Sequence, residues 1–224
     1  MRIPAWRQRK QTYLDSWAGA RRILLVRLDS LGDVLLMTPA FHAIKESQPA
    51  ARLTLLTSPV GAQIRGLNPD LEEVLAYASP LTDPWLEAPQ DPGRGLRLVR
   101  TLCERQFDGA IIFTSFRQSP LPAALLCYLA GIPLRLGATD EGAGSLLTTR
   151  HHWPPGLYHE VERALNLVGV AGYRTADPEL VLRIPAAIRH QVQRRLREQG
   201  VDPARPLIVV HPGCAMPART YDWR

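Results

Sequence analysis

Short apolar runs alternate along the chain with segments of helical periodicity. Branched apolar residues dominate residues 22–28 (RILLVRL), 52–57 (RLTLLT), 108–113 (DGAIIF) and 206–211 (PLIVVH), as is typical of buried strands in a parallel sheet. A shorter run predicts a strand at residues 134–137, and residues 71–77 fit either a strand or a short helix. Helices are predicted over about residues 34–46, 94–106, 122–130, 159–169 and 184–199.

This alternation predicts an α/β protein with a doubly wound, Rossmann-like parallel sheet and helices on both faces. Ligands of such sheets bind beyond the carboxyl ends of the strands. We therefore expect functional loops after residues 28, 57, 113 and 211, and a long functional loop over residues 138–160.

The pattern divides the chain into three parts. Residues 1–20 form an N-terminal extension, residues 21–184 a Rossmann-like domain, and residues 185–224 a basic linker helix with the beginning of a second domain. Because only one strand and one loop follow that helix, we expect the second domain to be truncated.

Composition narrows the class of protein. Hydrophobic residues make up 46% and charged residues 21%, as in an ordinary globular protein. No apolar stretch approaches the roughly 20 residues of a membrane-spanning helix, and the first 20 residues lack the apolar region of a secretory signal. The three cysteines are too scattered for a disulfide framework or a zinc site, which favours a reducing cytoplasm.

The net charge of +6 points to an anionic partner. Nearly all basic residues are arginines, whose planar fork suits phosphate and carboxylate groups. The partner could be nucleic acid, an acidic membrane surface or a phosphorylated substrate. A non-catalytic basic module that binds nucleic acid or phosphorylated ligands therefore stays open as the alternative to an enzyme, although the aromatic residues show no stacking pattern for single strands.

Aromatic residues in the N-terminal extension recur at helical spacing. Trp6, Tyr13 and Trp17 stand at i, i+7 and i+11 among basic residues, which would suit a helix lying on an anionic bilayer surface. A disordered leader is the other interpretation.

The segment Ser30-Leu31-Gly32-Asp33 joins the first predicted strand to the first helix. Ser30 and Asp33 have the spacing of a capping-box variant, so a structural role for Asp33 is one interpretation. Gly32 would let a ligand approach the backbone closely. A dinucleotide-binding glycine fingerprint and a Walker lysine are both missing from the sequence, which disfavours those two classes.

Five segments, in this order, resemble the heptosyltransferases of glycosyltransferase family 9, which act in lipopolysaccharide-core synthesis. They are RILLVRLDSLGDVLLMTPAFHAIKESQPAARLTLLT, FDGAIIF, RLG at 135–137, HEVER at 159–163, and LIVVHPGCAMPARTYDW. The resemblance implies a GT-B fold of two facing Rossmann-like domains, with the acceptor on the first and the nucleotide-sugar donor mainly on the second.

The resemblance also implies the chemistry. It implies inverting transfer of a heptose-like sugar from a nucleotide-diphosphate donor, such as ADP-heptose, to a lipopolysaccharide-core or other surface-glycan acceptor. Asp33 would be the general base, with Ser30 and Gly32 at the acceptor. The diphosphate would leave without a metal or other cofactor, bound by Gly213, Cys214, Ala215 and Arg219. Arg219 stands where the family usually has lysine, and Tyr221 where it usually has tryptophan.

The expected partners follow from this resemblance: a nucleotide-sugar donor, a lipid-linked or surface-glycan acceptor and an anionic membrane surface, with no nucleic acid. We expect a cytoplasmic enzyme, peripheral on the inner face of the plasma membrane. The 224 residues alone are expected to be inactive, because transfer requires donor and acceptor in one closed cleft.

Overall fold

The computed structural model describes residues 16–80, 91–115, 118–153, 156, 158–202, 204–214 and 221. Its contacts divide the chain into two compact units, Met1–Arg183 and Ile184–Arg224. Trp6, Tyr13, Ala215 and Arg219 lie outside the described residues, so the expectations that concern them remain predictions.

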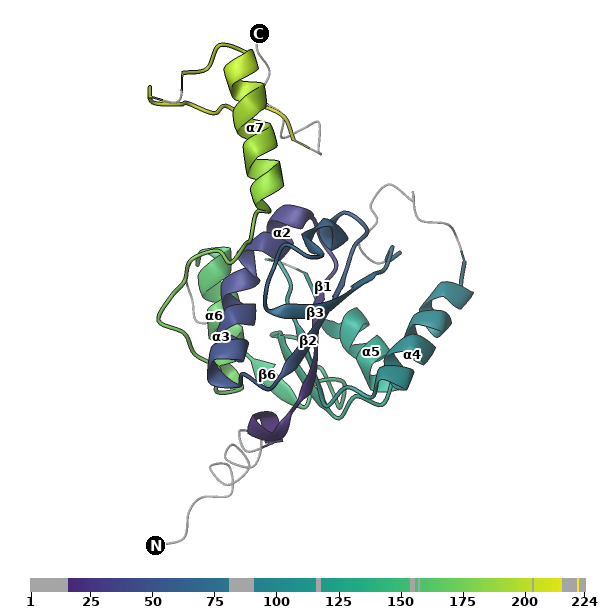
Figure 1. The fold of residues 1–224 in the computed structure, drawn as a ribbon. Coiled ribbons are helices and arrows are strands. Elements are labelled where there is room, and N and C mark those ends of the chain that lie inside the picture. Colours follow the sequence, from purple (N-terminus) through teal and green to yellow (C-terminus); the bar gives the residue numbers. More distant parts are fainter. Residues whose placement is uncertain are drawn as a thin grey trace, which may run out of the picture. The chain divides into compact units, whose positions relative to one another are not determined.

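A six-stranded parallel sheet lies at the centre of the first unit (Figure 1). The strand order is β3-β2-β1-β4-β5-β6. The strands are β1 (Arg22–Arg27), β2 (Arg52–Thr57), β3 (Leu71–Ala76), β4 (Gly109–Ile112), β5 (Leu134–Ala138) and β6 (Thr149–His151). The predicted parallel α/β sheet is thus confirmed. Residues 71–77 contribute a strand rather than a helix, and the expected long loop over residues 138–160 contains β6.

Helices cover both faces of the sheet, with α3 and α6 on one face and α4 and α5 on the other (Figure 1). The helices of this unit are α2 (Leu31–Leu36), α3 (Thr38–Ser47), the 3-10 turn η1 (Gly61–Ile64), α4 (Gly93–Arg105), α5 (Leu121–Leu129) and α6 (Glu160–Val170). Successive side chains of β1 point to opposite faces. Ile23 and Leu25 therefore join the core under α3 and α6, whereas Leu24 and Val26 join the core under α4 and α5.

The single helix predicted over residues 34–46 is two helices. α2 ends at Leu36, and α3 begins at Thr38 with Pro39 in its first turn. Proline has no N–H to donate to the carbonyl of Leu35, so a continuous helix would lose that bond. The Thr38 hydroxyl donates to the Leu35 carbonyl instead, at 2.7 Å.

The strand at the topological centre determines where a ligand can bind. β1 pairs with β2 on one side and with β4 on the other, so the chain reverses its direction of winding between β1 and β4. Open parallel sheets bind ligands at such switch points, beyond the carboxyl ends of the strands. The loops after β1 and β4 are therefore the first place to look for a site.

The membrane-surface interpretation of Trp17 is wrong. Its side chain is fully buried, and its indole N–H donates to the Thr149 hydroxyl at 3.2 Å. The indole fills the space beside Gly109, where an added Cβ would lie 2.5 Å from a ring carbon of Trp17. The helical spacing of the aromatic residues did not distinguish a surface position from a core position.

The second unit contains α7 (Ala186–Glu198), on which no residue is buried. Residues 206–211, expected to be a buried strand, are not part of a sheet, and Ile208 is 85% exposed. A buried strand needs neighbouring strands, and the described residues of this unit contain none. No helix within the described ranges is long and apolar enough to cross a membrane.

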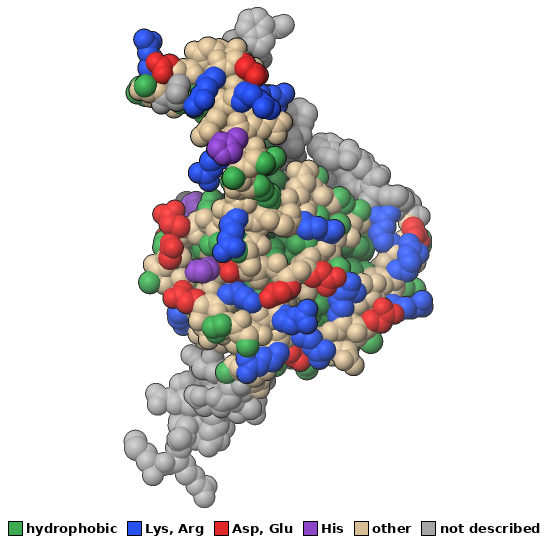
Figure 2. All heavy atoms as spheres, in the orientation of Figure 1, with side chains coloured by type: hydrophobic (Ala, Val, Ile, Leu, Met, Phe, Trp, Pro, Cys, Tyr) green, Lys and Arg blue, Asp and Glu red, His purple; other side chains and the backbone are tan. Residues whose placement is uncertain are grey.

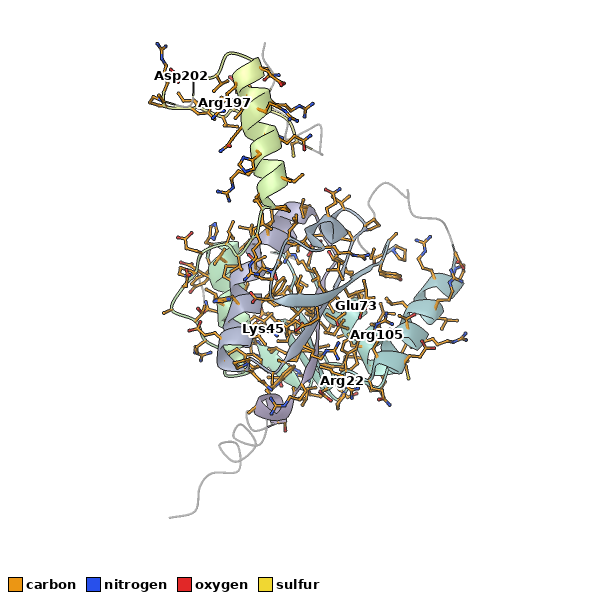
Figure 3. All side chains as sticks on the ribbon, in the orientation of Figure 1. Arg22, Lys45, Glu73, Arg105, Arg197 and Asp202 are labelled. Carbon is orange, nitrogen blue, oxygen red and sulfur yellow. The ribbon has the colours of Figure 1, made fainter. Side chains whose placement is uncertain are left out.

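Surface charge is mixed on the first unit. On the face shown in Figure 2, Lys and Arg side chains alternate with Asp and Glu rather than forming one basic patch. Ion pairs account for part of this mixture: Arg105 on α4 lies 2.7 Å from Glu73 on β3 (Figure 3). Ion pairs within the fold therefore neutralise part of the positive charge of the arginines.

We predict that Trp17→Ala lowers the free energy of unfolding by about 3–5 kcal/mol, because it removes a fully buried indole and leaves a cavity. Leu96→Ala, at a side chain that is 69% exposed, is the matched control and should change it by less than about 0.5 kcal/mol. Urea denaturation followed by circular dichroism measures both. If Trp17→Ala left the free energy of unfolding unchanged, the conclusion that Trp17 belongs to the buried core would be wrong.

Candidate active site

A buried arginine stands at the carboxyl end of β1. The Arg27 side chain has no solvent exposure. Its Nε lies 2.9 Å from Asp29 Oδ2, its Nη2 3.0 Å from Asp33 Oδ1, and its Nη1 4.0 Å from Glu160 Oε2. Nη2 also donates to the Ser115 hydroxyl at 2.5 Å. One guanidinium thus joins the loop after β1, α2, α6 and the loop after β4.

A second arginine neutralises part of the remaining negative charge. Arg163 Nε lies 3.4 Å from Glu160 Oε1, and the Arg163 guanidinium stacks over the Trp153 ring at 4.1 Å from its centre. Both of these cations are buried and paired. They therefore stabilise the carboxylates around them.

The Asp33 carboxylate is fixed by a capping box at the start of α2. Its Oδ2 accepts from the Ser30 backbone N–H at 3.1 Å and from the Ser30 hydroxyl at 2.7 Å. The Ser30 hydroxyl in turn accepts from the Asp33 N–H at 3.3 Å. Each carboxylate oxygen offers about two acceptor positions, so these bonds occupy Oδ2, whereas Oδ1 uses one position on Arg27 and keeps one.

The surroundings of Asp33 keep it ionised. Burial raises its pKa, but the hydrogen bonds from Ser30 and the charge of Arg27 outweigh burial and hold the pKa below its ordinary value. The capping interpretation of Asp33 is thus confirmed, and it is compatible with a chemical role. A hydrogen-bonded, ionised carboxylate with one open acceptor position can receive a proton from a ligand hydroxyl.

A pocket of about 290 Å³ opens at the switch point between β1 and β4, and we call it the β1–β4 pocket. Its polar wall consists of Asp29, Thr114, Gln118 and Ser119. Its apolar wall consists of Val26, Leu28, Ile112, Phe113, Pro122 and Ala123. The Gln118 side-chain amide donates to Asp29 Oδ1 at 2.9 Å, which fixes the polar wall to the loop after β1.

A second hollow of about 260 Å³ adjoins this pocket. It shares Thr114, Gln118 and Ser119 with the β1–β4 pocket and continues to Asp140, Glu141, Trp153 and Arg163. We call it the β5 hollow, because Asp140 and Glu141 follow β5. The two cavities together form a depression with apolar and polar walls, which includes Asp29 and Arg163.

The structure brings Ser30, Gly32 and Asp33 together at the start of α2. Gly32 has an ordinary backbone conformation, and a Cβ there would meet only the Ser30 hydroxyl oxygen at 3.7 Å, so the fold itself does not require glycine. Gly213 and Cys214 belong to the second unit, where both are exposed.

Four residues of this region were not predicted from the sequence: Arg27, Asp29, Gln118 and Glu160. One signal was present: Arg27 interrupts an otherwise apolar strand, and a charge in a buried strand needs partners. The residues of the HEVER segment (159–163) also have different structural roles, which their spacing did not reveal. His159 caps α6, whereas Glu160 and Arg163 belong to the charged cluster. Within the described part of the chain, no group of three His, Cys, Asp or Glu side chains could hold a metal ion.

Comparison with known proteins gives a consistent result. The model of "Glycosyltransferase family 9 (heptosyltransferase)" matches residues 95–224. A Haemophilus influenzae protein named "Putative glycosyltransferase" is 30% identical over 120 residues, which are 54% of this chain and 31% of that protein.

Solved structures share the fold. A glycosyltransferase family 9 protein from Veillonella parvula superposes with a TM-score of 0.67 at 19% identity, over 88% of this chain and 54% of that one. E. coli ADP-heptose LPS heptosyltransferase II gives 0.56 at 17% identity, over 83% and 52%. E. coli heptosyltransferase WaaC with ADP gives 0.52 at 21% identity, over 71% and 50%. The chain thus spans about half the length of these solved chains and about a third of the curated relative.

We predict that Ser30→Ala lowers the free energy of unfolding by about 1 kcal/mol at pH 7, because the helix loses its cap and the Asp33 carboxylate loses a hydrogen bond. The folded-state pKa of Asp33 is depressed, so its contribution to stability is present above the ordinary aspartate pKa and is lost as the pH falls through the folded-state value. The deficit of Ser30→Ala should therefore shrink below about pH 4.

Urea denaturation at pH 7 and at pH 3 measures this difference. Ser30→Thr keeps a capping hydroxyl and is the matched control, with a smaller deficit at pH 7. An equal deficit of Ser30→Ala at both pH values would show that the Ser30 hydroxyl does not stabilise the ionised form of Asp33.

Proposed function

This chain belongs to glycosyltransferase family 9, and from that membership we propose that the full-length protein transfers a heptose-like sugar from a nucleoside diphosphate to a glycan acceptor. Two solved structures of one neighbour support the donor class: WaaC is described with ADP in one and with ADP-2-deoxy-2-fluoro heptose in the other. ADP-heptose is accordingly the donor that we propose. The family match and the mixed surface charge favour a transferase over a basic binding module.

The observation that carries the proposal is the Asp33 carboxylate, whose pKa is held below its ordinary value. It shares the Arg27 guanidinium with Asp29, a residue that lines the pocket at the switch point. In the proposed step, an acceptor hydroxyl donates its proton to Asp33 Oδ1 while its oxygen forms a bond to the anomeric carbon. The bond from that carbon to the diphosphate breaks on the opposite face, so the configuration inverts. Its depressed pKa makes Asp33 a weak base. The hydroxyl proton is therefore transferred as the hydroxyl becomes more acidic during its attack on the anomeric carbon.

Arg27 has a defined part in this step. Its guanidinium holds Asp33 Oδ1 at 3.0 Å and orients the remaining acceptor position of that oxygen. Ser30 holds the other carboxylate oxygen. Asp33 therefore cannot rotate freely about its side-chain bond, and such preorganisation lowers the entropic cost of reaction. We place Ser30 and Gly32 at the edge of the acceptor.

The donor half of the proposal depends on the resemblance of residues 207–223 to the family. Backbone N–H groups of Gly213, Cys214 and Ala215, with the Arg219 side chain, would bind the diphosphate and stabilise its departure without a metal or other cofactor. We further propose a lipid-linked or surface-glycan acceptor, such as lipopolysaccharide core, on the cytoplasmic face of a membrane. The neighbour described as an LPS heptosyltransferase supports that acceptor class.

We predict that Asp33→Asn in the full-length protein lowers kcat by about 10²–10⁴-fold, because the amide cannot accept the hydroxyl proton. Glu46→Gln, at an exposed position of α3, removes a carboxylate elsewhere and should leave kcat unchanged. Product formation from ADP-heptose, followed by mass spectrometry, measures both variants. Full turnover by a correctly folded Asp33→Asn protein would exclude Asp33 as the base.

A further inference from the structure

We propose that Thr38 is a positioning residue for the transfer reaction, because its hydroxyl fastens the segment that leads to the second unit to the helix that carries Asp33. We call residues 174–183 the connector. Arg183 ends the connector and is also the last residue of the first unit. The role of Thr38 in transfer rests on the proposed function, whereas the attachment itself belongs to the first unit alone.

The connector runs antiparallel to α3 and is bound at both ends of that helix (Figure 1). At the carboxyl end of α3, the Ser47 hydroxyl donates to the Arg174 carbonyl at 3.1 Å and accepts from the Arg174 N–H at 2.9 Å. At the amino end, the Thr38 hydroxyl accepts from the Val181 N–H at 3.0 Å. The first and last residues of α3 therefore hold the connector along the helix.

Two further hydrogen bonds lie beside the one from Val181 to Thr38. The Asn68 side-chain amide donates to the Val181 carbonyl at 2.9 Å, and the Arg183 N–H donates to the Leu67 carbonyl at 2.7 Å. We call these three hydrogen bonds the clasp. Through it, three backbone groups at the end of the connector are bound to the first unit, immediately before the chain enters the second.

Side-chain burial contributes little to this attachment. Leu180 is 50% exposed and Leu182 is 36% exposed, and the side chains of Glu179 and Arg183 are also exposed. Residues 174–183 form neither a helix nor a strand. A segment with few buried apolar contacts opens easily unless hydrogen bonds hold it. The position of the end of the connector therefore depends on the clasp.

The attachment at Ser47 alone would not fix the end of the connector. The seven residue steps from Arg174 to Val181 can extend over about 23–25 Å. The helix between Ser47 and Thr38 rises by only about 14 Å. The connector is therefore about 10 Å longer than the distance that it spans, and Val181 would be free to move if its bonds to the first unit were lost.

Thr38 joins the connector to the helix of the proposed base. Its hydroxyl donates to the Leu35 carbonyl at 2.7 Å, and Leu35 belongs to the same six-residue helix, α2, as Asp33. A hydroxyl has one donor and two acceptor positions, so this fully buried group makes both bonds at once. The end of the connector is thus fixed relative to Asp33. Such alignment matters, because a displacement of about 1 Å far from the chemistry can cost about 10²-fold in rate.

Amide hydrogen exchange in the 224-residue chain, measured by NMR, tests the clasp. The amides of Val181 and Arg183 should exchange about tenfold more slowly than that of Leu182, whose N–H donates no hydrogen bond to a described residue. Thr38→Val should speed exchange at Val181 by about tenfold, because the acceptor is lost. Thr38→Ser keeps the hydroxyl and should retain the slow exchange.

Two further variants make the test specific. Asn68→Asp keeps the side-chain oxygen that accepts from the Asp70 N–H at 3.0 Å but loses the amide that donates to Val181, so it should also speed exchange there. This variant tests the clasp even if Thr38→Val does not fold. Thr57→Val is the matched control, because Thr57 is fully buried and its hydroxyl has no hydrogen-bond partner among the described residues. It should leave exchange at Val181 unchanged.

Turnover of the full-length protein with ADP-heptose tests the positioning role. Thr38→Val should lower kcat by about tenfold or more, because the connector is no longer held to α2. It should change KM for either substrate by less than about twofold, because Thr38 itself contacts neither. Thr38→Ser should recover most of the wild-type kcat, and Thr57→Val should leave it unchanged.

Three results would overturn the inference. Val181 and Arg183 amides that exchange as fast as Leu182 in the wild-type chain would exclude the clasp. Faster exchange in Thr38→Val with a wild-type kcat would exclude the positioning role, as would an equal loss of kcat in Thr57→Val. The proposed function is judged separately: a wild-type full-length protein that transfers no sugar would contradict it and the role of Thr38 in transfer, but not the clasp.

Discussion

The buried guanidinium of Arg27 is the constraint on which this end of the sheet depends. Removing an arginine from water costs several kcal/mol, and that cost is offset only if carboxylates and hydroxyls surround it closely. Asp29 and Asp33 meet this requirement at 2.9 Å and 3.0 Å, and Ser115 adds a hydroxyl at 2.5 Å. Glu160 contributes its charge from 4.0 Å, without a hydrogen bond to Nη1. The loops after β1 and β4 and the starts of α2 and α6 are therefore held together by one charge, which also positions the candidate site.

The chemistry of the site follows from the same arrangement. Burial raises the pKa of Asp33, but the hydrogen bonds from Ser30 and the charge of Arg27 hold it below its ordinary value. The carboxylate is therefore ionised, as the proposed proton acceptor must be. The proposed proton acceptor shares the Arg27 guanidinium with Asp29, which lines a small pocket with one apolar and one polar wall.

Much of the fold could be predicted because the buried strands are continuous apolar runs, and Asp33 could be singled out because it follows the first of them in a recognisable segment. The Arg27 cluster could not be predicted, since Glu160 is distant in sequence and only the folded sheet brings it to β1. Trp17 shows a related limit: helical spacing is the same on a membrane surface and in a core. Residues 206–211 show another, because an apolar run becomes a buried strand only where the fold provides neighbouring strands.

The most direct measurement of the role of Arg27 is the carboxyl titration of Asp33, followed by ¹³C NMR in the wild-type chain and in Arg27→Met. Glu73, whose pKa is lowered chiefly by the hydrogen bond from Arg105, provides an internal reference that the substitution leaves intact. We predict that Asp33 titrates below its ordinary pKa in the wild-type chain and at a higher pH in Arg27→Met, while Glu73 keeps the same pKa in both. An Asp33 pKa that does not change when Arg27 is replaced would contradict the role of Arg27.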